Sequence, residues 1–317
     1  MLRHLGYVIV SLSVDASTGQ TCRLANATPR RLRALIASNL DNLARVLAFN
    51  AAQGVRLYRI NSDIVPFGSH AVNRLRWWQT FGPRFQALGA LIRRHRMRVS
   101  MHPGQFTVLN SLSPAVVAAS VEELAWHARF LDALGVDGTC KIVIHVGGMA
   151  DGPEAAMARF VRVARTLPPA VRRRLIVEND ERCFTVEHAL AVSRRTGLPV
   201  VFDWLHHRAN PGTARTPAEV RRLVARCFDT WRRVDGVPKI HLSSQARGGR
   251  RGRHGDWVRL SDMLDFLAIA PPRPFDCMIE AKRKDLALFR LRRDLARAGI
   301  VETGLARRPE SPARLTA

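Results

Sequence analysis

Short runs of apolar, mostly β-branched residues recur along the chain, and amphipathic stretches separate them. Runs of this length and composition are typical of strands that are buried on both faces. Eight of them are predicted as strands, at residues 6–12, 55–60, 97–101, 141–145, 174–179, 198–203, 237–243 and 274–281. In the segments between them, apolar residues at spacings of three and four indicate helices with one buried face. The clearest predicted helices are 30–53, 84–96, 121–135 and 217–234.

The alternation of strands and helices indicates the fold class. Buried strands joined by helices form a parallel sheet, and eight strand–helix units in roughly 290 residues fit a closed barrel better than an open sheet. No G-x-G-x-x-G follows the first run, which disfavours a dinucleotide-binding fold. We therefore predict an α/β protein with a single (β/α)8 TIM barrel over residues 1–290. For residues 291–317 we predict a helix end and a disordered basic tail.

From length, hydropathy and cysteine usage we expect a soluble protein of the cytoplasm, associated with the nucleoid through DNA. With 317 residues, 47% of them hydrophobic, the chain can bury a large core. Ser11 and Asp15 interrupt the first apolar run, and no small-residue cleavage site or second hydrophobic span follows. The cysteines are odd in number, scattered and without a CxxC pair, which argues against disulfides and a cysteine zinc site. They are Cys22, Cys140, Cys183, Cys227 and Cys277.

A formal net charge of +24 indicates a polyanionic partner, with nucleic acid as the first candidate. Only four of the 50 cationic residues are lysines, namely Lys141, Lys239, Lys282 and Lys284, and the rest are arginines. Genomic base composition can produce such a skew without selection for binding. Charge alone therefore leaves both explanations open.

Candidate metal ligands gather at the ends of the predicted strands, where a (β/α)8 barrel carries its active site. Seven of the eleven histidines fall there: His70, His102, His145, His206, His207, His241 and His254. The carboxylates Glu178, Asp203 and Glu280 accompany them. Imidazole and carboxylate are ligands for zinc, manganese or iron, and these candidates exceed the four that one tetrahedral ion needs. The sequence thus predicts several metal ions.

Each candidate has a plainer alternative. A single histidine such as His70 can be a hydrogen-bonded loop residue. Glu178 and Glu280 are harder to explain without cations, because each ends an apolar strand where a lone carboxylate is costly to bury. Several divalent ions in a basic protein indicate phosphodiester hydrolysis. Lys239, close to His241, would repel metal unless it is carboxylated to a carbamate; otherwise it contacts the scissile phosphate or pairs with a carboxylate.

A series of motifs in the chain resembles the UV damage endonuclease family over about residues 5 to 285. The motifs are LGYV (5–8), YRINSD with SH (58–70), SMHPGQFTVLNS (100–111), IHVGG (144–148), VEND (177–180), FDWLHH (202–207), KIHLSS (239–244), HGDW (254–257) and IEAK (279–282). The resemblance implies a TIM barrel related to apurinic endonucleases and xylose isomerases. It also implies three divalent ions, with manganese favoured over zinc, cobalt or magnesium. The implied reaction nicks double-stranded DNA immediately 5′ of a cyclobutane dimer or 6-4 photoproduct, leaving a 3′-hydroxyl and a 5′-phosphate.

The same resemblance implies roles for individual residues. The implied metal ligands are His70, His102, His145, Glu178, Asp203, His206, His241, His254 and Glu280. Lys239 would be the modified lysine, catalytic together with Glu178 and Glu280. Gln105, Phe106 and Tyr7 would contact the lesion. The resemblance implies UV-damaged DNA as the partner; we expect a monomer without membrane association or an obligate protein partner.

Two loops carry the expected DNA contacts. Gln105 and Phe106 follow Pro103 and Gly104, which would shape a turn that projects an amide and an aromatic ring into the duplex. The family has tyrosine at the aromatic position, and Phe106 lacks its hydroxyl; the alternative for Phe106 is a core aromatic beneath the loop. The loop 243–257 interleaves arginines with glycines, which suits phosphate binding or a flexible solvated charge run. These arginines are Arg247, Arg250, Arg251 and Arg253.

Other functions remain as alternatives. An apurinic-site endonuclease on the same barrel would use the same metal cluster and wedge. A sugar isomerase is disfavoured by the charge and by the Gln105–Phe106 loop, because a small sugar needs no wedge. A catalytically inert DNA-binding protein is disfavoured because every ligand position is filled.

Overall fold

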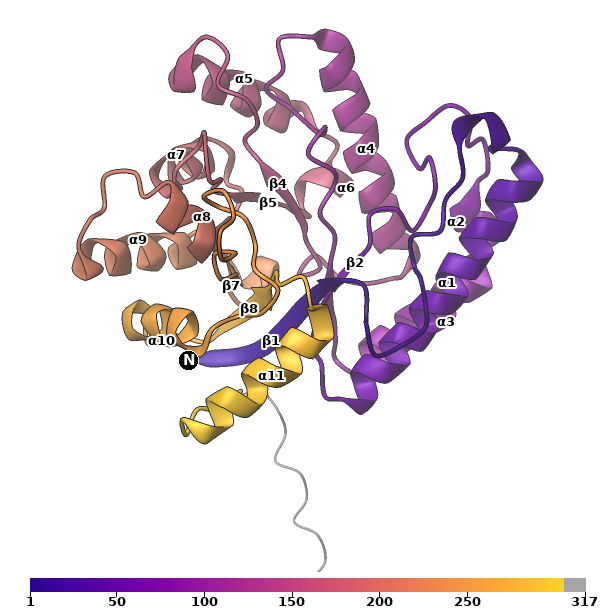
Figure 1. Cartoon of the computed structure of the whole chain (residues 1–317). Coiled ribbons are helices and arrows are strands. Elements are labelled where there is room, and N and C mark those ends of the chain that lie inside the picture. The colour runs from indigo at the N-terminus through magenta and orange to yellow at the C-terminus, as the bar shows by residue number, and fades with distance from the viewer. Residues whose placement is uncertain (305–317) are drawn as a thin grey trace, which may run out of the picture.

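The computed structural model describes residues 1–304 and contains eight parallel strands surrounded by helices (Figure 1). All eight predicted strands are confirmed, and the α/β barrel with them. The strands are β1 (Leu2–Ile9), β2 (Leu57–Ile60), β3 (Arg98–Ser100), β4 (Ile142–His145), β5 (Leu175–Glu178), β6 (Val200–Asp203), β7 (Lys239–Leu242) and β8 (Phe275–Ile279).

The strands follow one another around a barrel. Their order is β3-β2-β1-β8-β7-β6-β5-β4, and every pairing is parallel. Between the two end strands, Met101 and Ile142 form a parallel bridge just beyond β3. In it the Met101 amide donates to the Lys141 carbonyl oxygen at 3.0 Å, and the Val143 amide donates to the Met101 carbonyl oxygen at 3.0 Å. The barrel is therefore closed by this narrow contact, and all its strands end at the same rim.

The helices form the outer layer, and the four predicted ones are present with shifted ends. They are α1 (Pro29–Ala52), α2 (Trp77–Thr80), α3 (Gly82–Arg94), α4 (Pro114–Ala133), α5 (Gly152–Thr166), α6 (Pro169–Arg172), α7 (Val186–Thr196), α8 (Trp204–Ala209), α9 (Pro217–Asp229), α10 (Leu260–Ile269) and α11 (Lys284–Arg297), with 3-10 turns at Leu24–Asn26 and Arg233–Asp235. Helix α4 begins before residue 121 because the Ser113 side chain caps it and proline occupies its first position. Helix α9 ends before residue 234, where the Trp231 indole donates to the Val200 carbonyl oxygen at 2.8 Å.

The alternation of side chains along each strand determines what fills the barrel. Val143, Ile176 and Val201 pack together with Trp231 inside the barrel. Two residues further along the same strands, and therefore on the same face, come His145, Glu178 and Asp203. A layer of ligand-type side chains thus lies directly above an apolar layer.

Below the ligand layer the barrel holds buried charges. Asp276 of β8 is fully buried and accepts hydrogen bonds from the Arg3 Nε and Nη2 atoms at 2.8 and 2.6 Å. The Arg98 Nη1 atom donates to the same carboxylate at 2.9 Å. Such pairing is what makes a buried carboxylate tolerable.

The segment that follows β8 forms the last helix and then returns to β1. Helix α11 runs through residue 290 without a break. Beyond it, the Glu302 carboxylate accepts from the Leu5 amide at 2.6 Å, and the Thr303 amide donates to the Leu2 carbonyl oxygen at 3.0 Å. Residues 302–304 therefore lie against the start of β1. The predicted disordered tail at 305–317 lies outside the described residues.

All five cysteines are free thiols, and Cys140, Cys227 and Cys277 are buried as predicted. Across residues 1–304 we find no helix with the length and apolar character needed to cross a membrane.

Candidate metal centre and active site

Side chains from six strand ends converge at the C-terminal rim of the barrel. In residues 1–304, three groups of potential ligand atoms each lie within 4.8 Å of one another. The groups are His102 with His145 and Glu178, Glu178 with Asp203 and His206, and Glu178 with His241 and Glu280. The structure thus brings together seven of the nine predicted ligands.

Glu178, the last residue of β5, is common to all three groups. Its Oε1 atom lies 2.6 Å from His241 Nδ1 and 3.8 Å from His206 Nδ1. Its Oε2 atom lies 3.4 Å from His102 Nε2 and 3.8 Å from His145 Nε2. A single buried carboxylate therefore lies within 3.8 Å of four imidazoles.

Backbone carbonyls orient several of the imidazoles. His102 Nδ1 lies 3.0 Å from the Pro103 carbonyl oxygen, and His206 Nδ1 lies 3.0 Å from the Asn179 carbonyl oxygen. His254 Nδ1 lies 2.9 Å from the Glu280 carbonyl oxygen. A carbonyl oxygen only accepts, so each Nδ1 carries the proton and each Nε2 keeps its lone pair. This second contact is the usual way in which a protein prepares a histidine for a metal.

The carboxylates also have oxygen atoms to spare. Asp203 caps α8, with Oδ1 accepting from the His206 amide at 2.7 Å, while its Oδ2 is buried without a hydrogen-bond donor in the described chain. Glu178 Oε2 is likewise buried without a donor there, whereas Glu280 Oε1 is paired with Arg59. Partnerless buried carboxylate oxygens are costly, and together with imidazole Nε2 atoms they form the donor set of a divalent transition metal. The residues therefore fit a bound metal ion.

Burial favours the neutral, metal-binding form of two imidazoles; it would also lower the pKa of His206, but Asp203, Glu280 and Glu181 raise that pKa above its usual value. It lowers the pKa of His102 to about 4 and that of His145 to about 3. Burial raises the pKa of Glu178 well above its usual value, and the nearby Glu280 and Asp203 raise it further. For Glu280, burial would also raise the pKa, but Arg59 and His241 hold it well below its usual value. Neutral imidazoles are the form that binds metals.

Arg59 is a buried member of the site that sequence reasoning missed. Its Nη2 atom lies 2.6 Å from Glu280 Oε1 as an ion pair and 2.9 Å from His241 Nε2 as a hydrogen bond. Because a guanidinium only donates, His241 Nε2 accepts here, and Nδ1 carries the proton towards Glu178. The available signal was a charged residue inside the apolar run 55–60.

Lys239 lies inside the barrel, two residues before His241 on the same face of β7. It is 1% exposed, and its Nζ atom has no hydrogen-bond partner in residues 1–304. Burial lowers its pKa well below the usual value, and the cations Arg98 and Arg59 lower it further. In residues 1–304 no carboxylate pairs with Lys239.

Three other histidines have distinct positions. His70 is exposed, and its Nδ1 atom accepts from the Val72 amide of its own loop at 3.1 Å. His254 lies at the rim of the cluster, with its ring centroid 5.7 Å from that of His206. Neither His70 nor His254 belongs to the three groups of potential ligand atoms found in residues 1–304. His207 turns away and packs against Phe202 and Trp204.

The loop after β3 presents the predicted wedge to solvent. Gln105 is exposed, and Phe106 is 68% exposed, so the alternative of a core aromatic is wrong. A cavity of about 230 Å³ opens beside this loop and reaches His102 and His145. Tyr7 corrects the expectation of a lesion contact: it is fully buried, and its hydroxyl donates to Asn50 Oδ1 at 2.7 Å.

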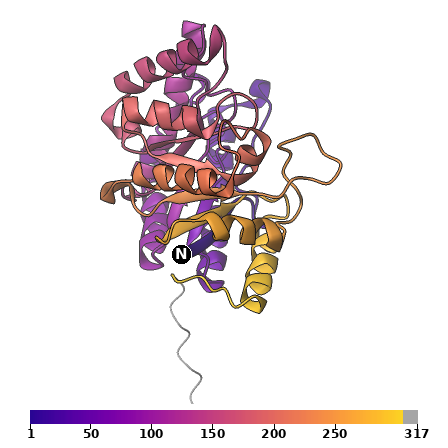
Figure 2. The ribbon, with the colours of Figure 1, turned by 90° about the vertical axis from the view of Figure 1, so that its left-hand side faces the viewer.

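The arginine-rich loop extends from the same rim. Arg247, Arg250, Arg251 and Arg253 are all exposed. The backbone folds back on itself, with an antiparallel bridge between Gln245 and His254 and the Ala246 amide donating to the Arg253 carbonyl oxygen at 2.8 Å. In Figure 2 an orange loop in this part of the chain projects well beyond the rest of the ribbon.

Comparison with known proteins agrees with this geometry. The family model for UV-endonuclease UvdE matches residues 3–306. The chain belongs to this family. A UV DNA damage endonuclease of Bacillus cereus (strain G9842) is 33% identical over 301 residues, which cover 92% of this chain and 94% of that protein.

Solved structures support the same family and the barrel. The crystal structure of SacUVDE is 30% identical, with a TM-score of 0.87, and the match covers 94% of this chain and 100% of that one. Endonuclease IV from Thermus thermophilus is 18% identical, with a TM-score of 0.55 over 93% of this chain and 99% of its own. This second likeness is one of fold alone.

Proposed function

We propose that the protein nicks double-stranded DNA immediately 5′ of UV photoproducts, both cyclobutane dimers and 6-4 photoproducts, leaving a 3′-hydroxyl and a 5′-phosphate. Membership of the UvdE family supports the substrate class. The observation that carries the proposal is the buried cluster around Glu178, with its partnerless oxygens beneath an exposed aromatic loop.

The cluster would hold up to three divalent ions, with manganese favoured. Bound there, such ions would lower the pKa of a water nucleophile, neutralise the phosphate oxygens and stabilise the leaving oxygen. The chain's own part is to hold the ligands in place. Asp203 fixes α8 and with it His206, while the Pro103 and Asn179 carbonyls keep His102 and His206 in the tautomer with a free Nε2.

The exposed loop would supply lesion recognition. A photoproduct weakens stacking in the duplex, and the Phe106 ring can replace that stacking once the lesion leaves the helix. Gln105 can satisfy exposed base edges with its amide. The cavity lined by His102, Gln105 and His145 supports a short path from this loop to the cluster. Arg247, Arg250, Arg251 and Arg253 would hold the phosphate backbone.

Lys239 would be carboxylated. A carbamate forms when a neutral amine attacks carbon dioxide and releases one proton, and burial keeps the Lys239 amine neutral. The product is an anion, which Arg98 and Arg59 would stabilise. A ¹³C NMR carbonyl signal from protein supplied with ¹³C-bicarbonate would reveal it; the same spectrum from Lys239→Arg is the control.

The proposed activity is tested with an end-labelled duplex that carries one photoproduct, compared with an undamaged duplex and one with an abasic site. We expect a nick just 5′ of the photoproduct with manganese and none with chelator. Glu280→Ala and His241→Ala should abolish it, whereas Glu122→Ala, an exposed glutamate on α4, should not. Cleavage of the abasic duplex alone would transfer the protein to apurinic-site repair, and unchanged turnover in either cluster variant would remove that residue from the mechanism.

A further inference from the structure

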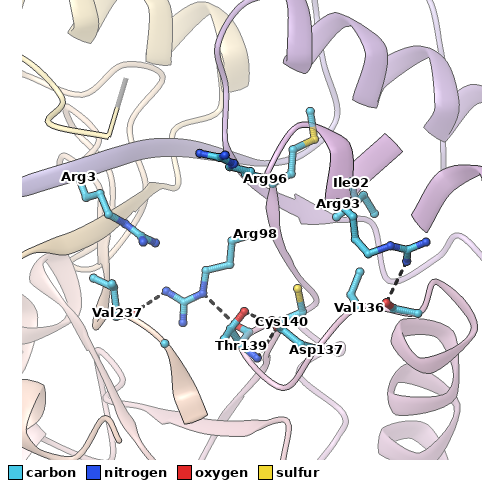
Figure 3. Close-up of a pocket in the computed structure, with 13 residues that line it drawn as sticks. Arg3, Ile92, Arg93, Arg96, Arg98, Val136, Asp137, Thr139, Cys140 and Val237 are labelled. Atoms are coloured by element: carbon cyan, nitrogen blue, oxygen red, sulfur yellow. Dashed lines mark hydrogen bonds between the residues drawn. The ribbon is translucent and has the colours of Figure 1, made fainter. Parts of the chain in front are cut away.

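The face of the barrel opposite the metal centre carries a second, arginine-lined cavity (Figure 3). Its volume is about 450 Å³, within the range of small-molecule sites. Its lining comes from the starts of strands, including Arg3 of β1 and Arg98 of β3, and from the turns after α3 and α4. The metal ligands stand at the other ends of the strands, so the two sites are separate.

Cations exceed anions in this cavity. Arg3, Arg93, Arg96 and Arg98 line it, against the carboxylate of Asp137 at the rim and that of Asp276 beneath. The apolar part of the lining is formed by Ile92, Met97, Val136 and Cys140. An apolar wall beside several guanidinium groups suits a ligand with both an anionic and a flat apolar part.

Only some of these arginines are engaged in the fold. Arg98 uses all three nitrogens, on the Thr139, Val237 and Asp235 carbonyl oxygens and on Asp276. Arg3 binds Asp276 through Nε and Nη2 and leaves Nη1 without a partner in the described chain. The Arg93 Nη1 atom donates to the carbonyl oxygens of Leu134 and Gly135 at 3.1 and 3.0 Å.

Arg96 is the unusual member of the group. Among residues 1–304 its guanidinium has no hydrogen-bond acceptor or ion-pair partner, and Figure 3 places it above Arg98. Its backbone has φ = 50°, a left-handed conformation in the turn after α3. Glycine is the common residue at this position, and α4 ends on the other side of the cavity with Gly135 at φ = 63°. Arg96 thus ends α3 in a left-handed conformation, and its exposed guanidinium stands at the cavity without a partner in the described chain.

We propose that this cavity binds a nucleotide-sized, phosphate-bearing ligand, with Arg96, Arg93 and Arg3 Nη1 holding the phosphate. Guanidinium donors match phosphate oxygens in geometry and charge. The phosphate can come from a free nucleotide or from the backbone of a DNA segment other than the one at the metal centre. This site is independent of the proposed nicking reaction.

The decisive variant is Arg96→Gly, because it removes the guanidinium and relieves the strained backbone at once. Thermal unfolding should show a protein at least as stable as the wild type, so that a loss of binding is not a loss of folding. Arg94→Ala is the matched control: it removes the same charge from an exposed position in the last turn of α3, outside the cavity.

Pyrophosphate is the probe, titrated by calorimetry into protein dialysed free of metal. We expect the wild type to bind pyrophosphate. Arg96→Gly should lose about tenfold or more in affinity, because one charge-assisted hydrogen bond contributes that factor. Arg94→Ala should lose less than about twofold. Absent binding in the wild type, wild-type affinity in Arg96→Gly, or an equal loss in Arg94→Ala would overturn the proposal.

Displacement of bound pyrophosphate then identifies the source of the phosphate. Displacement by an undamaged duplex supports a DNA backbone, and displacement only by a nucleoside diphosphate supports a free nucleotide. If neither displaces it, the assignment to nucleotide phosphate is overturned.

Discussion

Replacing Arg59 with methionine tests whether the fold depends on a positive charge in the middle of the carboxylate cluster. Arg59 is 4% exposed and lies 2.6 Å from Glu280 Oε1. At this separation, and with an effective dielectric constant of about 20, the attraction is on the order of 6 kcal/mol. Desolvation of the guanidinium offsets part of it. Breaking such a buried pair by removing one partner costs about 3–5 kcal/mol. We expect Arg59→Met to lower the free energy of unfolding by that amount in the presence of chelator.

The matched control is Arg84→Met. Arg84 pairs with Asp41 at 2.8 Å, but the two side chains are 47% and 60% exposed. A surface pair contributes about 0–1 kcal/mol. Urea denaturation followed by tryptophan fluorescence measures both variants. Similar losses in the two would refute the argument from burial.

The pH dependence and a metal titration sharpen the same test. Arg59 and His241 hold the pKa of Glu280 below its usual value, so the stability they provide is present above the ordinary carboxyl pKa. It is lost as the pH falls through the lowered pKa, and the gap between wild type and Arg59→Met should therefore narrow in acid. Manganese should also narrow it, because bound cations would replace the missing charge. A gap that is constant with pH and metal would mean that Arg59 acts through packing alone.

Three further predictions follow from single contacts. Asp276→Asn should cost about 3 kcal/mol of unfolding free energy at neutral pH, because it weakens a buried carboxylate's pairing with Arg3 and Arg98. Burial would raise the pKa of Asp276 but the two arginines keep it lowered, so this stability is lost in acid, and a urea titration at several pH values checks it. Phe106→Ala should leave the melting temperature unchanged, since the ring is 68% exposed. In a filter-binding assay it should weaken binding to photoproduct DNA more than binding to undamaged DNA. Equal losses of affinity would contradict the role of Phe106 as a wedge. His254→Ala should lower the metal content measured by mass spectrometry more than His70→Ala, because only His254 has its Nδ1 proton held by a carbonyl and its ring beside His206; the reverse order would contradict this.

Strand positions were predictable because the signal is local. Each buried run is bounded by polar residues, and the last residues of β4, β5 and β6 are His145, Glu178 and Asp203. Once the runs are parallel strands of one barrel, their ends must meet at one rim. This geometry, rather than any motif, is why the ligand cluster could be predicted from spacing.

The face of a residue within a strand could not be predicted in the same way. Tyr7 and Arg59 both lie in apolar runs. Successive residues of a strand face opposite sides, and the sequence does not say which of the two alternating sets faces the barrel interior. Tyr7 faces the helices and is covered by them, whereas Arg59 faces the interior and meets His241, 182 positions further along the chain. A shift of one residue along a strand thus separates a tyrosine packed under the helices from a cation in the candidate site.

The position of Arg59 bears directly on how the cluster would take up metal. In the group of Glu178, His241 and Glu280, both nitrogens of His241 are engaged, one by Glu178 and the other by Arg59. A cation bound at Nδ1 would require the proton to move to Nε2, where it would face a guanidinium that cannot accept it. Arg59 would therefore have to give up this contact, whereas His102 and His206 already present a free Nε2. The three groups are thus chemically unequal: ions should fill the His102 and His206 groups first, and the His241 group last, with Arg59 as the competing cation.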